Sequence, residues 1–153
     1  KLVWADTQLA DTAFAVQTNR TTDLLAGFIA AGGSTQGVTI MRIHCSFVTT
    51  SVQAAVIGSR LRQGFVVDVT GENPSSEPYA DWMWLGDTWA GTGQSGVLTA
   101  GAVIGNTIDI RSKRKCDEVG QSLFHCMLWQ PGATGSETTA TYDGHFRVLL
   151  ALP

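Results

Sequence analysis

The sequence predicts an all-β fold: one antiparallel β-sandwich domain of about eight strands over residues 1–153, with one short helix near residues 22–32. Apolar residues alternate with polar residues at a period of two rather than 3.6 in most segments. Clusters of Gly, Pro, Asn and Ser separate these segments. A length of 153 residues fits one domain with one core. Both a jelly roll and an immunoglobulin-like sandwich match this pattern, and we expect the jelly roll.

Two segments show the alternation most clearly. In residues 39–49, apolar and polar positions alternate: Met41, Ile43, Cys45 and Phe47 against Arg42, His44 and Ser46. In residues 55–70 the same alternation recurs, with Gly58 and Gly64 as expected bends. Because the link around residues 50–54 is short enough for a hairpin, we expect these two strands to pair antiparallel.

The other segments predicted as strands are, in chain order, residues 2–9, 13–18, 82–89, 107–111, 122–130 and 138–150. Residues 122–130 are apolar on both faces, which predicts a central strand covered on two sides. One segment predicts a helix, with Thr22 as its N-cap and Gly32–Gly33 as its end.

The composition excludes several classes of protein. With 44% hydrophobic and 15% charged residues, the chain should fold rather than stay disordered. Its formal net charge of −3 excludes a globally basic nucleic-acid-binding protein. No run of about 18 apolar residues occurs, so we expect no membrane span. The low charge predicts a surface hidden against neighbouring subunits, and therefore a homo-oligomer.

No motif predicts catalysis, a metal site or a cofactor. The segment Gly93-Gln94-Ser95-Gly96-Val97 lacks the last Gly of a nucleophile elbow. Three Cys without a C-x-x-C spacing argue against a disulfide framework and a zinc ribbon. The candidate metal ligands are His44/Cys45, His125/Cys126 and His145. Neighbouring residues on a strand point to opposite faces, so each His-Cys pair can offer only one member to a given site. We therefore expect that the chain is not an enzyme. The alternative is a metal-dependent β-sandwich enzyme.

Three tryptophans fall close together, Trp82, Trp84 and Trp89. Trp is enriched at the centres of protein interfaces, which favours packing in the core or between subunits. Exposed aromatic rings also stack on sugars or bases, so a carbohydrate- or ligand-binding module is the other interpretation.

The charge of the chain is concentrated in one place. Four of its ten Lys and Arg residues lie in Arg111–Lys115, here called the basic segment: Arg111, Lys113, Arg114 and Lys115. Asp109, Asp117 and Glu118 flank it. Three interpretations are open: a solvated corner without function, an ion-pair network with these carboxylates within or between subunits, or a phosphate-facing patch on nucleic acid.

Several segments together resemble a known family. They are Val3-Trp4-Ala5, Asp23-Leu24-Leu25-Ala26, residues 38–45, Asp81-Trp82-Met83-Trp84, residues 108–123, which contain the basic segment, and Val148-Leu149-Leu150-Ala151-Leu152. In these, the chain resembles the small single jelly-roll coat proteins seen in environmental sequences of single-stranded DNA viruses. The resemblance spans most of the chain.

The resemblance implies a function. It implies a virion structural protein, a capsid subunit that self-assembles into a symmetric shell enclosing nucleic acid. Coat proteins of this kind commonly carry a basic N-terminal arm that faces the genome. From Lys1 onward the sequence shows no such arm, which leaves open whether one precedes Lys1.

Overall fold

In a computed structural model of the chain, the described residues are 1–15, 19–51, 60–69, 84–89, 103–130 and 139–153. They form eight strands and one short helix. The strands are β1 (Leu2–Ala15), β2 (Asn19–Asp23), β3 (Thr39–Ser51), β4 (Arg60–Val69), β5 (Trp84–Trp89), β6 (Val103–Lys115), β7 (Gln121–Gln130) and β8 (Thr139–Ala151), and the helix is α1 (Ala26–Ala30). The predicted all-β fold is confirmed, whereas the single-domain organisation stays a prediction.

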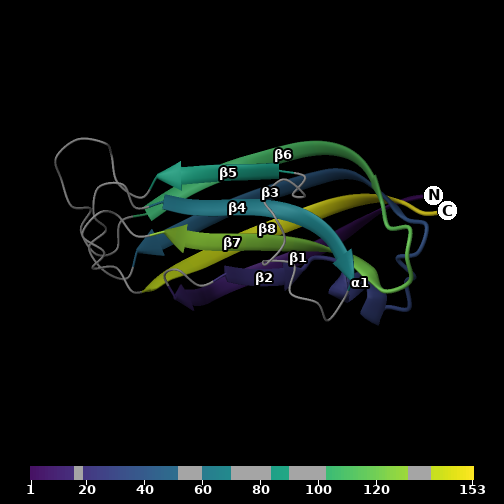
Figure 1. Ribbon diagram of the computed structural model, residues 1–153, viewed down its shortest axis with the longest axis horizontal. Helices are drawn as coiled ribbons and strands as arrows, with labels where there is room; N and C mark the ends of the chain where they lie inside the picture. The colour runs from purple at the N-terminus through teal and green to yellow at the C-terminus, as the bar shows by residue number, and fades with distance from the viewer. Residues whose placement is uncertain (16–18, 52–59, 70–83, 90–102, 131–138) are drawn as a thin grey trace.

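The strands form two four-stranded antiparallel sheets, which lie one over the other (Figure 1). Sheet A has the order β1-β8-β3-β6, and sheet B has the order β2-β7-β4-β5. Among the described strands, β4 and β5 are the only two that follow one another in the chain and share a sheet. Eight strands that alternate in this way between two antiparallel sheets form a jelly roll, so the expected jelly roll is confirmed.

The core lies between the two sheets, on their facing surfaces. Sheet A contributes Ile43, Cys45, Tyr142, Phe146 and Val148, and sheet B contributes Phe65, Val67, Leu123 and Met127. The rings of Phe65 and Phe146 meet edge to face across the sheets, with centroids 6.4 Å apart. Burying these large side chains is the main stabilising term of the sandwich.

The pairing expected between residues 39–49 and 55–70 is wrong. Both segments contain strands, β3 and β4, but these lie in different sheets. β3 pairs with β6 and β8, and β4 pairs with β5 and β7. Both strands alternate because each buries one face in the shared core, and this periodicity is the same whichever strand lies beside it.

The predicted central strand is confirmed. β7 lies between β2 and β4 in sheet B. Its Leu123 and Met127 are buried in the core between the sheets, whereas Phe124 and Cys126 are buried in a second cluster with Val66. Burial on both faces explains why this segment shows no alternation of apolar and polar residues.

The predicted helix forms, but its start differs from the prediction. Thr22 belongs to β2, and α1 begins only at Ala26. Asp23 ends the strand, and its Oδ1 accepts the backbone N–H of Leu25 at 2.9 Å. The predicted end is confirmed, because the N–H groups of Gly32 and Gly33 bond the carbonyls of Ile29 and Phe28, a Schellman motif. Gly32 adopts the positive φ of 87° that this motif needs.

Candidate functional surface

The basic segment lies at the end of β6, which is an edge strand of sheet A. Arg111, Lys113, Arg114 and Lys115 are all exposed. On a strand, alternate residues share a face, so Arg111, Lys113 and Lys115 lie on the face of sheet A turned away from sheet B. We call this the outer face of sheet A. Long cationic side chains on an edge strand also discourage pairing with foreign strands.

Of the predicted charge partners of the basic segment, Asp109 bonds an arginine of another strand. Arg42 of β3 donates to it from Nε at 2.7 Å and from Nη2 at 2.5 Å. These hydrogen bonds, helped by the charge of Arg42 and less by that of Arg111, hold the pKa of the Asp109 carboxyl below its usual value. Asp109 therefore stays ionised and bound to β3.

A β-bulge positions Arg42 for this contact. The register of β3 against both of its neighbours shifts between Ile40 and Arg42. Ile40 and Ile43 are consequently both buried, although three positions apart, and the two residues between them are half-buried. The bulge brings Arg42 opposite Arg111 and two pairs from Asp109, which is the next position on the same face. Sequence reasoning missed Arg42 because it reads there as one more polar residue of an alternating strand.

The other two predicted partners lie in the turn after β6. Asp117 Oδ1 is 3.6 Å from Lys115 Nζ, at an exposed position. The backbone N–H groups of Asp117 and Glu118 both donate to Oε1 of Gln121, at 2.8 and 3.1 Å. Within the described part of the chain, no ion pair engages Arg111, Lys113 or Arg114. The cationic charge of β6 is thus only partly compensated.

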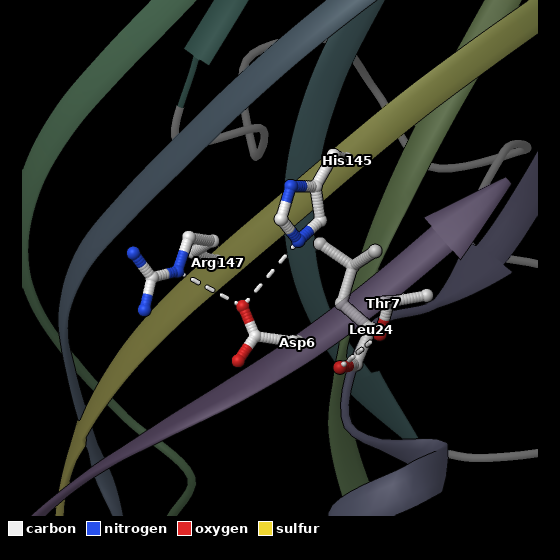
Figure 2. A network of polar contacts seen from close by, with 5 residues as sticks. All are labelled: Asp6, Thr7, Leu24, His145 and Arg147. Carbon is white, nitrogen blue, oxygen red and sulfur yellow. Dashed lines mark hydrogen bonds and ion pairs between the residues drawn. The ribbon is translucent and has the colours of Figure 1, made fainter.

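A second charged group crosses the outer face at β1 and β8 (Figure 2). Asp6 Oδ1 accepts a hydrogen bond from Arg147 Nε at 3.0 Å and lies 3.5 Å from His145 Nε2. The Arg147 guanidinium also lies over the ring of Trp4, 4.9 Å from its centroid. The contact between Asp6 and Arg147 escaped sequence reasoning because β1 and β8 lie at opposite ends of the chain.

The strand register places these groups in two parallel rows across sheet A. One row is Asp6, Arg147, His44 and Asp109, and the next is Trp4, Leu149, Arg42 and Arg111. Beyond the first row, an open depression of about 660 Å³ is lined by residues of all four strands, among them Gln8, Ser46, Thr107 and His145. The outer face therefore combines charged, aromatic and polar side chains.

The three histidines do not converge on one site. His125 is fully buried between the sheets, whereas His145 is exposed on the outer face and His44 lies in the charged row. Burial lowers the pKa of His125 to about 3, so the ring is neutral. Among the residues that the structure describes, no cluster of three or more His, Cys, Asp or Glu side chains could hold a metal ion.

His125 belongs to a polar group inside the core instead. Its Nε2 lies 3.0 Å from Gln63 Oε1, which also accepts the hydroxyl of Tyr142 at 3.1 Å. The Tyr142 hydroxyl lies 3.9 Å from the Cys45 sulfur. This group links β4 and β7 of one sheet to β3 and β8 of the other, and it gives the core directional contacts.

The predicted aromatic site falls mostly outside the described residues. Trp82 precedes the described part of this segment, and Trp84 and Trp89 are the ends of β5, of which the backbone course is described. Their role as interface aromatics or as a stacking platform stays a prediction. In the described part of the chain, no helix is long and apolar enough to cross a membrane.

Comparisons with known proteins give structural likenesses only. No protein-family model and no curated protein matches the sequence. The chain is similar to the Tobacco streak virus coat protein dimer (TM-score 0.45, 12% identity, covering 99% of this chain and 86% of that one). It is similar to Desmodium yellow mottle tymovirus (TM-score 0.43, 9% identity, covering 100% and 90%). It is also similar to the decameric BFDV capsid protein (TM-score 0.41, 9% identity, covering 100% and 99%).

Proposed function

We propose that the chain is a viral coat-protein subunit, which assembles with copies of itself into a closed shell around nucleic acid. The observation that carries the proposal is the strand order of the two sheets, β1-β8-β3-β6 and β2-β7-β4-β5. The jelly roll is an architecture of viral capsid proteins, and also of lectins and cupins. Since one fold serves several functions, the side chains must distinguish among these.

The surface of the subunit favours association. Leu2, on an edge strand, is 62% exposed, and Val119 in the turn after β6 is 76% exposed. Only 15% of the residues in the chain are charged, so few charged side chains would oppose contact through these apolar groups. Contact with neighbouring copies would remove them from water.

The alternatives draw less support from the described residues. A metal-dependent enzyme would need converging ligands, but His125 is inside the core and His145 outside it. A carbohydrate-binding module would need exposed aromatic rings beside a polar depression. The depression on sheet A is lined by polar side chains and by Leu9, Phe47 and Val48, of which Phe47 is 3% exposed.

The test is the state of the purified chain. Light scattering after size exclusion should find particles of many subunits, and electron microscopy should show closed shells of uniform size. A chain that stays monomeric at high concentration and binds immobilised glycans would contradict the proposal and favour the carbohydrate-binding module. The same result would give the localisation of the protein, because a subunit of a closed viral shell is a component of the virion.

A further inference from the structure

Charge is divided unevenly over the parts of the fold. The strands of sheet A contain six Lys or Arg against four Asp, and those of sheet B contain three of each. The remaining segments contain one Lys against six Asp or Glu. Sheet A is therefore the cationic part of a chain whose net charge is −3. A polyanion would be repelled by the segments outside the strands and attracted to sheet A.

Within sheet A, the excess charge lies on β6. Arg42 is bound to Asp109, and Arg147 is bound to Asp6. Arg111 and Lys113 point to the same outer face and are in no ion pair with another described residue. Two cations on one face can bind the phosphates of a nucleic acid, because contacts of this kind require clustered positive charge and do not read the base sequence.

An aromatic ring lies in the same row as Arg111. Trp4 is separated from it by β8 and β3, a distance of roughly 14 Å at the usual strand spacing. The Arg147 guanidinium covers part of the ring, yet Trp4 remains 42% exposed. Aromatic rings on an open sheet stack on unpaired bases, which is how several sheet proteins bind single strands.

We propose that the outer face of sheet A binds single-stranded nucleic acid, with Arg111 and Lys113 on its phosphates and Trp4 stacked on a base. The inference rests on the proposed function, because it assigns the face that would meet the enclosed genome. A second copy of the chain is the other occupant to consider. A two-fold contact, however, would place two copies of this same cationic face against each other.

The test is binding of a fluorescently labelled oligothymidylate, followed by anisotropy at several salt concentrations. The double variant Arg111→Gln/Lys113→Gln should weaken binding about tenfold or more at low salt and lower the slope of log affinity against log salt by about 1.4. The matched control is Arg60→Gln/Arg62→Gln, the same change at the same spacing on β4 of sheet B. It should change affinity less than about twofold.

Trp4 provides an independent readout. Trp4→Leu should weaken binding about fivefold to a hundredfold and leave the salt slope unchanged, because stacking releases no counterions. Trp4→Phe retains a ring and should restore most of the affinity. Circular dichroism of each variant verifies that it is folded.

Light scattering on the same variants separates this inference from the proposed function. Equal losses in the sheet A and sheet B double variants would overturn the inference, even if the wild type forms shells. Unchanged oligonucleotide binding with loss of assembly would overturn it as well, and would make the outer face a contact between copies. A wild type that binds through this face but stays monomeric would retain the inference and reject the shell.

Discussion

Asp109 receives two hydrogen bonds from Arg42 across the β3–β6 pair, at 2.7 and 2.5 Å. The two residues are 67 positions apart in the chain. The bond neutralises Arg42, and Asp109 thereby becomes unavailable as a close partner for the basic segment. The cationic character of the outer face therefore comes from Arg111 and Lys113.

Replacing Asp109 with Asn should make the outer face more cationic. Asp109→Asn removes the charge that compensates Arg42, so we expect tighter oligonucleotide binding and a salt slope steeper by about 0.7. The measurement is the same anisotropy titration. Asp87→Asn, on β5 of sheet B, is the control. An equal gain in affinity in Asp87→Asn would show that the affinity depends on the net charge of the chain and not on the position of that charge.

His125 should make folding stability depend on pH. Burial lowers its pKa to about 3, against an ordinary value of 6.5. Between these values the unfolded chain binds a proton that the folded chain rejects, so stability falls as the pH decreases. The loss is about 1.4 kcal/mol for each pH unit below about 6.5. Urea unfolding from pH 7 to pH 5, at fixed protein concentration, measures it.

The control for this effect is a comparison of variants. In His125→Phe the free energy of unfolding should vary less with pH than in the wild type. Equal slopes in the wild type and His125→Phe would show that this buried ring does not cause the acid sensitivity.

Gly144 occupies a place in the core where a methyl group does not fit. A Cβ there would lie 2.6 Å from Cε1 of Tyr142 and 2.9 Å from Cε2 of Phe146. Gly144→Ala should therefore destabilise the fold by about 1–3 kcal/mol, measured by urea unfolding. Gly27→Ala is the matched control, because a Cβ at this position in α1 meets nothing within 4 Å. That variant should be unchanged or more stable by up to about 1 kcal/mol.

The three cysteines should be unreactive in the folded protein. Burial raises the pKa of Cys45 and Cys126 to about 12 and that of Cys116 to about 11. The thiolate is the reactive form, so a disulfide reagent at neutral pH should label none of them within minutes. All three thiols should react in denaturant. Fast labelling of one cysteine in the native protein would mean that its strand opens readily.

The sequence predicted the strands well because their periodicity is local. The predicted bounds of β3 and β7 lie within two residues of the observed ones. A strand buried on one face shows alternation and a strand buried on both faces shows none, and either pattern depends only on which faces are covered. The helix start was wrong because Asp23 bonds the backbone two residues later while still at the end of a strand. A side-chain bond of this kind resembles an N-cap in sequence.

Strand pairing and the outer face could not be predicted, because both depend on residues far apart in the chain. Arg147 and Asp6 are 141 positions apart, and no local pattern connects them. The basic segment was visible as a cluster, but its position on an edge strand follows only from the sheet order. The hairpin expected between residues 39–49 and 55–70 is wrong for the same reason, since alternation does not specify a partner.

The most direct test of the proposed coat protein is electron microscopy of the purified chain, combined with absorbance at 260 and 280 nm after nuclease treatment. We expect closed shells of uniform diameter that retain nuclease-protected nucleic acid. Monomers free of nucleic acid, at concentrations where subunits of a shell associate, would contradict it.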